Sequence, residues 1–183
     1  MNTVDIVAKF NGFLQICTEY LKDWLNEMLP KVSENWWQEC VLSNLSYNQR
    51  NFAKENNYNN LSGFDLAALL KIADKSWYDM RNFAYLPTKD REIIREMQKI
   101  RNRWAHYSCS ILDKDSIVFD IDITLKFLLW LDVPSAIIND VDRFMQDVQN
   151  TVITVAATNS IANNKMELQA KTTSDEIAEK SQV

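Results

Sequence analysis

Hydrophobic residues recur every three or four positions over most of the first 155 residues, and this period predicts a chain built from helices. The first stripe predicts one long helix with a single apolar face, and it consists of Val7, Phe10, Leu14, Cys17, Leu21, Trp24 and Met28. Pro30 follows the stripe and is expected to end the helix or to mark its boundary. This helix either faces the core, the simpler interpretation, or offers a short heptad seam to a partner.

Five further helices are expected, over roughly 33–45, 62–80, 88–104, 120–131 and 135–155. Ser33 is placed to cap the first of these, and Thr88, after Pro87, the third. The core stripe of the helix that begins near Thr88 is Ile93, Met97, Ile100 and Trp104. The Asn-rich segment 46–60 is interpreted as a frayed helix end followed by a loop, because Asn favours turns.

Composition supports an all-α fold. Only 2 Gly and 3 Pro occur in 183 residues, too few for the frequent turns of a β-sandwich or barrel. The hydrophobic fraction of 46% is enough for a buried core. We therefore expect a compact bundle of about five to six helices over residues 1–157. Residues 158–183 are expected to form a polar, disordered tail, since 159–183 contain no aromatic residue.

The charge is uneven along this acidic chain. The net charge of −5 argues against broad electrostatic coating of nucleic acid. Between Lys89 and Arg103, however, six basic residues accompany three acidic ones. The basic ridge, as we call it, lies opposite the core stripe at i,i+4 spacing and comprises Arg91, Arg95, Lys99 and Arg103. It is either a solvated face paired with Glu92 and Glu96, or a track for phosphates in which Arg95, Lys99 and Arg103 bind RNA.

Several classes of protein fit poorly. No run of 18 apolar residues and no signal peptide is present, so we expect a cytoplasmic protein without membrane contact. Three distant cysteines (Cys17, Cys40 and Cys109) indicate reduced thiols. One histidine and these cysteines cannot supply a zinc site, and the aspartates from Asp113 to Asp122 lack the Gly and Glu of a calcium loop. No metal ligand and no cofactor is therefore predicted.

The most informative segment is Arg101-Asn102-Arg103-Trp104-Ala105-His106, which contains the only histidine. Arg101 lies on the flank of the core stripe, where a structural ion pair or a substrate phosphate would satisfy its guanidinium. Arg101 and His106 diverge by about 140° on a straight helix. They converge only if the helix ends or bends near Ala105, or if two copies of the chain meet across a two-fold axis.

This segment matches the Arg-polar-x-x-x-His signature of the HEPN superfamily, and further blocks extend the likeness. They are Trp36-Trp37, Leu61 with Asp65 to Ile72, Trp77, Ile100 to His106, and Asp120-x-Asp122-x-Thr124-Leu125. Together they resemble the Swt1-type HEPN domain from about Tyr20 to Leu131. The resemblance implies a compact, usually dimeric helical bundle. It also implies a metal-independent endoribonuclease in which Arg101 and His106 cut RNA and Asn102 assists.

In such an enzyme the 2′-OH of RNA attacks the adjacent phosphorus and leaves a cyclic phosphate. His106 would transfer protons and Arg101 would stabilise the charged oxygens. By resemblance, the setting would be phage defence or a toxin–antitoxin system. The expected partners are RNA, a second copy of the chain, and a cognate antitoxin or larger defence complex. The alternative is a HEPN-like interaction module without catalysis, with Arg101 tied to an internal carboxylate.

Overall fold

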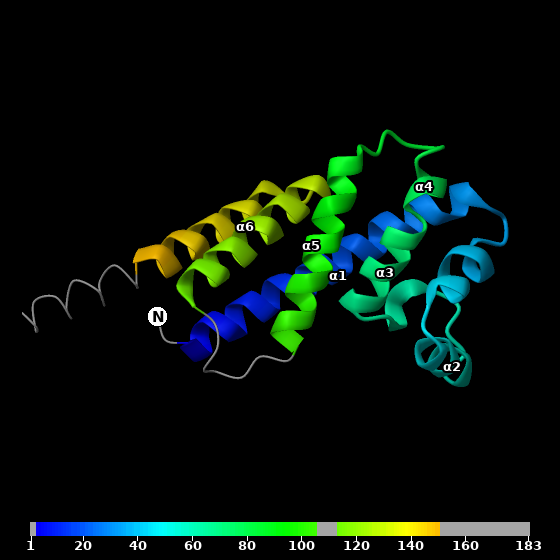
Figure 1. Ribbon diagram of the computed structural model, residues 1–183, viewed down its shortest axis with the longest axis horizontal. Helices are drawn as coiled ribbons and strands as arrows, with labels where there is room; N and C mark the ends of the chain where they lie inside the picture. The colour runs from blue at the N-terminus through cyan, green and yellow to red at the C-terminus, as the bar shows by residue number, and fades with distance from the viewer. Residues whose placement is uncertain (1–2, 106–112, 151–183) are drawn as a thin grey trace, which may run out of the picture.

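The computed structural model describes residues 3–105 and 113–150, and within these ranges the chain is helical with no strand (Figure 1). The α-helices are α1 (Thr3–Val32), α2 (Tyr47–Glu55), α3 (Leu66–Lys75), α4 (Trp77–Met80), α5 (Thr88–Ala105) and α6 (Lys114–Trp130). Residues 135–150 are helical as well. The all-α prediction is confirmed, although the described residues contain more helical segments than the five to six expected. The expected tail, 158–183, lies outside the described residues.

The long first helix is confirmed, but its buried face is rotated from the expected one. Val7, Leu14 and Trp24 are only partly buried. The buried positions are Phe10, Phe13, Cys17, Leu21, Leu25, Met28 and Leu29. Pro30 lies inside the last turn rather than at the boundary, and α1 continues to Val32.

The segment after Ser33 is helical in an irregular form rather than as the expected α-helix. It contains a π-helix, Trp37–Val41, and a 3₁₀ turn, Leu42–Asn44. Side chains bond back to the backbone here: the Ser43 hydroxyl donates to the Glu39 carbonyl, and Asn44 Nδ2 donates to the Cys40 carbonyl at 2.8 Å. Such bonds compete with the regular ladder, which accounts for the irregular geometry.

The prediction of a frayed end and loop over 46–60 was wrong for its first half. α2 occupies this segment and opens with a capping box, in which Ser46 Oγ accepts from Gln49 N and Gln49 Oε1 accepts from Ser46 N. These two bonds satisfy donors that a helix N-terminus otherwise leaves unpaired. Local capping therefore outweighed the low helix propensity of the asparagines.

The helix expected over 62–80 bends at Ser76, which separates α3 from α4. Ser76 is buried, and its hydroxyl accepts from Asn44 Nδ2 at 3.1 Å. α5 begins at Thr88, as expected, and buries Ile94 in place of Ile93. α6 begins six residues earlier than the expected Asp120, because Asp113 caps it.

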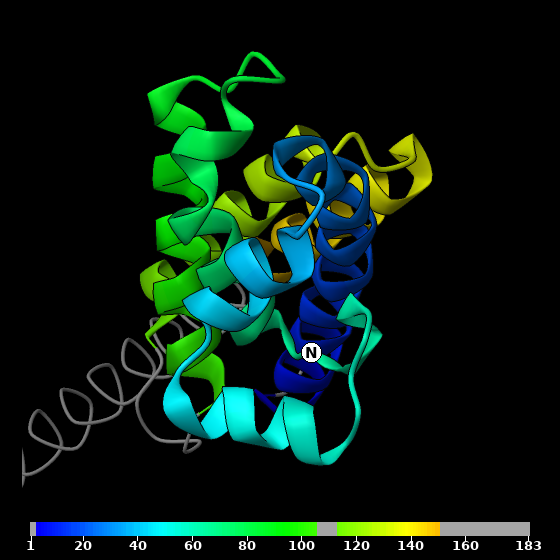
Figure 2. The same cartoon turned by 90° about the vertical axis from the view of Figure 1, so that its right-hand side faces the viewer.

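The helices share one core in which α5 packs against both α3 and α6, while α1 packs against α3, α4 and α6. In Figure 1 α5 crosses α1 steeply, with α2, α3 and α4 to one side of it and α6 to the other. The view in Figure 2, turned by 90°, shows α2 at the edge of the molecule. The helix over 135–150 joins the core through Phe144, whose ring lies 5.4 Å from that of Phe13. No helix of the described residues is long and apolar enough to cross a membrane.

Candidate active site

Arg101 is held by Asp65, the N-cap residue of α3. Arg101 Nη2 donates to Asp65 Oδ2 at 2.5 Å, while Asp65 Oδ1 accepts from the backbone N–H of Ala68 at 3.0 Å. One carboxylate thus caps α3 and orients the guanidinium at the far end of α5. Arg101 is 27% exposed and Asp65 is 55% exposed, so both remain within reach of a ligand.

Asn102 lies beside Arg101 and is exposed. Arg101 Nη1 donates to Asn102 Oδ1 at 3.4 Å, a long bond that places the two side chains together. The structure therefore brings together two of the three residues predicted to be catalytic. Arg101 and Asp65 also line a small hollow, together with residues that include Asn11, Gln15 and Thr18 of α1 and Trp104.

Arg103 and Trp104 are both tied to Asp120 of α6. Asp120 is completely buried and accepts from Arg103 Nε at 3.1 Å, from Arg103 Nη2, and from Trp104 Nε1 at 2.7 Å. Charge-assisted bonds to a buried carboxylate are strong and directional. The Trp104 ring also stacks on Phe10 of α1, with ring centroids 4.1 Å apart. We call this arrangement the Asp120 clamp, and it fixes the last turn of α5 beside Arg101 and Asn102.

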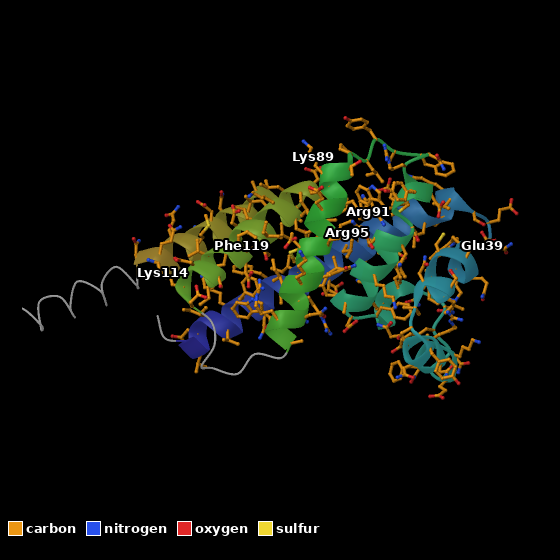
Figure 3. The ribbon with its side chains drawn as sticks, viewed as in Figure 1. Glu39, Lys89, Arg91, Arg95, Lys114 and Phe119 are labelled. Atoms are coloured by element: carbon orange, nitrogen blue, oxygen red, sulfur yellow. The ribbon has the colours of Figure 1, made fainter. Side chains whose placement is uncertain are left out.

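The basic ridge is largely paired with carboxylates. Arg91 Nε and Arg95 Nε both bind Asp74 Oδ1 of α3, at 2.8 and 2.9 Å, and Figure 3 shows both arginines along α5. The ridge also contains Lys99, which pairs with Glu96 at 2.6 Å, and Arg103, which belongs to the Asp120 clamp. Of the three residues predicted to bind RNA, Arg95 is 51% exposed, Lys99 67% and Arg103 41%. Their role in RNA binding stays a prediction.

His106 and Cys109 lie outside the described residues, so the expected convergence of His106 with Arg101 stays a prediction. α5 extends to Ala105, the residue before His106. Cys17 and Cys40 are buried thiols, and burial raises the pKa of both. Among the described residues no three His, Cys, Asp or Glu side chains gather as metal ligands would.

A groove of about 670 Å³ opens next to Asn102, and sequence reasoning did not find it. We call it the α3 groove because four of its residues lie on that helix. Its lining residues are Ser46, Gln49, Ala67, Lys71, Asp74, Lys75, Gln98 and Asn102. Lys71 and Lys75, one turn apart on α3, were the available signal, but the sequence does not show which helices stand beside them.

One comparison with known proteins identifies a family. The model of the Swt1-like HEPN family matches residues 13–131, which covers α1 from Phe13 through to the end of α6. No curated protein and no solved structure matches the chain. The matched region contains Arg101, Asn102 and His106 together with both carboxylates, Asp65 and Asp120, that hold the end of α5. The chain belongs to the Swt1-like HEPN family.

Proposed function

We propose that this chain is a metal-independent endoribonuclease of the HEPN type, with its active site at Arg101, Asn102 and His106. The observation that carries the proposal is the Arg101–Asn102 pair, partly exposed and held in place by Asp65 within a family match that includes His106. A guanidinium on an exposed, oriented support is suited to bind a phosphate with two parallel hydrogen bonds.

In the proposed reaction the 2′-OH of one nucleotide attacks its own 3′ phosphorus. The P–O bond to the next nucleotide breaks, which gives a 2′,3′-cyclic phosphate and a 5′-OH end. His106 acts as the proton-transfer group, since an imidazole titrates near neutral pH. Arg101 stabilises the added negative charge on the phosphorane oxygens. Asn102 donates a hydrogen bond to a phosphate oxygen or to the attacking group.

The test uses the full chain, total RNA and EDTA. The wild type is expected to cleave, and Arg101→Ala and His106→Ala are each expected to lose on the order of 10²-fold or more in rate, as for removal of a transition-state donor or a general acid–base. Arg143→Ala is the matched control, since Arg143 is an exposed arginine of the helix over 135–150, far along the chain from the site, and pairs at 3.4 Å with Asp140 of that same helix. Absence of cleavage by the wild type, or equal cleavage by His106→Ala, contradicts the proposal.

The biological setting that goes with this activity is phage defence or a toxin–antitoxin system, with a cognate antitoxin or a larger complex as partner. We further propose that two copies of the chain form a homodimer with the two sites at their interface. Size-exclusion chromatography with light scattering tests this. A monomeric mass at the concentrations where RNA is cleaved rules out the shared site.

A non-catalytic interaction module is the second candidate function. It is favoured by the Arg101–Asp65 ion pair, because a structural role requires such a carboxylate partner. The partner is more than half exposed rather than internal, however, so the pair is open to exchange with an incoming anion. A stable complex with another protein, together with intact RNA in the assay above, would select this function.

A further inference from the structure

The α3 groove has the chemistry of a binding site that the catalytic proposal does not use. Its two lysines, Lys71 and Lys75, make no ion pair within the described residues. Asp74, its one carboxylate, is bound by both Arg91 and Arg95. The lysine charges therefore stay uncompensated in a chain whose net charge is −5. A concave surface that concentrates positive charge on an acidic protein is suited to an anionic ligand.

The other polar side chains of the groove are uncharged: the Ser46 hydroxyl and three amides. Gln49 and Gln98 line it together with Asn102. Gln98 Nε2 donates to the Leu70 carbonyl at 3.1 Å, and Gln49 Oε1 belongs to the capping box of α2. These bonds fix both side chains and use only one end of each amide. The Gln98 oxygen and the Gln49 nitrogen take no part in these bonds, so the amides that line the groove retain an acceptor and a donor for a ligand.

The groove adjoins the candidate active site because Asn102 belongs to both. Arg101 Nη1 donates to the Asn102 oxygen, and the same asparagine lines the groove. A polymer whose phosphate reaches Arg101 would pass directly from that phosphate into the groove. A free inorganic anion would fill only a small part of a volume of about 670 Å³.

We propose that the α3 groove binds the nucleotides next to the scissile phosphate of a single-stranded RNA, with Lys71 and Lys75 on its phosphates and the amides on a base edge or a 2′-OH. Single-stranded RNA presents such edges, whereas the bases of a duplex are paired and stacked. This inference rests on the proposed function for its choice of RNA and assigns the substrate a path across the surface.

The experiment measures RNA affinity and not cleavage. Fluorescence anisotropy with a labelled single-stranded RNA is recorded over a range of salt concentrations, with every variant placed in the full chain carrying His106→Ala. Removing two phosphate contacts lowers the slope of log K against log salt by about 1.4, which corresponds to roughly ten-fold weaker binding at physiological salt. We expect this change for the double variant Lys71→Ala/Lys75→Ala.

The matched control is Lys54→Ala/Lys89→Ala, which removes the same charge from two exposed lysines outside the groove. Figure 3 shows Lys89 at the start of α5. The control is expected to change affinity less than two-fold and to leave the slope as it was.

A second variant keeps the lysines. Ala67→Glu places a carboxylate in the groove, and glutamate has good helix propensity. Ala136→Glu is its control, the same change at an exposed position outside the groove. Ala67→Glu is expected to weaken binding at least as much as the double lysine variant, and Ala136→Glu less than two-fold. If circular dichroism shows that the lysine variant does not fold, the comparison of Ala67→Glu with Ala136→Glu decides whether the groove binds RNA.

Groove variants that bind RNA as tightly as their controls overturn the inference, and so does a parent chain that binds no RNA. Binding that depends on the groove, with no cleavage by the wild type, supports the inference and removes the catalytic proposal alone. Cleavage by the wild type, with binding that does not depend on the groove, supports the catalytic proposal and removes the groove inference alone. The two proposals therefore fail separately.

Discussion

The Asp120 clamp predicts a large loss of stability from a change of one atom. Asp120→Asn keeps the size of the side chain but replaces a carboxylate oxygen by an NH₂ group. That group then faces a donor, either the Arg103 guanidinium or Trp104 Nε1, where the carboxylate accepted from both. A buried donor left without its acceptor costs about 1–3 kcal/mol, and breaking a buried ion pair costs about 3–5 kcal/mol.

Exposure of one partner reduces this range. Asp120 is completely buried, but the Arg103 side chain is 41% exposed, so water can solvate the guanidinium once the pair is broken. We therefore expect a decrease in the free energy of unfolding of about 2–3 kcal/mol. For a domain of this length that corresponds to a fall in Tm of roughly 4–12 °C.

The control lies two residues further along the same helix. Asp122→Asn removes an exposed carboxylate paired with Lys126 at i,i+4, so it should cost less than about 0.5 kcal/mol. Urea unfolding followed by circular dichroism measures both variants. If Asp120→Asn and Asp122→Asn lie within about 0.5 kcal/mol of each other, the clamp does not stabilise the fold as argued.

A double-mutant cycle locates the effect. Trp104→Phe removes the Nε1 donor while keeping an aromatic ring against Phe10. If Asp120 and Trp104 act together, the cost of Asp120→Asn should shrink by about 0.5 kcal/mol or more in the Trp104→Phe background. Strict additivity would show that the Trp104 bond contributes nothing.

Three further predictions follow from local contacts. Asp65→Ser keeps a capping hydroxyl but removes the ion pair with Arg101, so its free energy of unfolding should lie within about 1 kcal/mol of the wild-type value. Asp65→Ala also removes the cap and should lose about 1 kcal/mol more. Equal stability of the two variants would contradict the capping role. Hydrogen bonds from the backbone N–H and hydroxyl of Ser116 lower the pKa of the Asp113 carboxyl. The stability that this carboxylate contributes is therefore fully present above its ordinary pKa of about 3.9 and is lost as the pH falls through the lowered pKa. The stability difference between the wild type and Asp113→Ala, measured by urea unfolding, should therefore vanish in strong acid; a difference independent of pH would count against the charged cap. Burial raises the pKa of the Cys17 and Cys40 thiols, so peptide mapping after alkylation at neutral pH should find both unmodified in the folded chain and modified in denaturant, and rapid labelling of the folded chain would be inconsistent with the structure.

Much of the fold could be predicted because it depends on local signals. The period of the apolar residues gave α1 and α5, and Thr88 marked the start of α5. Segment 46–60 was misinterpreted because its Asn content was weighed more heavily than the Ser46–Gln49 capping box, which is visible in the sequence. The start of α6 was missed in the same way, since Asp113 caps it through Ser116.

The candidate site was only half predictable. Arg101 and Asn102 were named from the motif, and an ion pair was one of the two interpretations given for Arg101, beside a substrate phosphate. Its partner was not, because Asp65 lies 36 residues away and only the packing of α3 against α5 brings the two together. Arg103 was assigned to the surface ridge for a related reason: a helical wheel shows that it lies away from the core stripe of α5, but not that the buried Asp120 of α6 reaches it.

Because Asp65 occupies the guanidinium of Arg101, the free protein contains its own competitor for that group. In the proposed reaction, an RNA phosphate would compete with this carboxylate for Arg101, so the affinity for RNA should be lower than a guanidinium without a partner would give. Simple anions such as chloride or free phosphate would meet the same competition, which a ligand with further contacts would overcome more readily. Asp65 should therefore limit which anions bind the Arg101 guanidinium. Without Asp65, the affinity of Arg101 for simple anions should rise, and its preference for a polymer over them should fall.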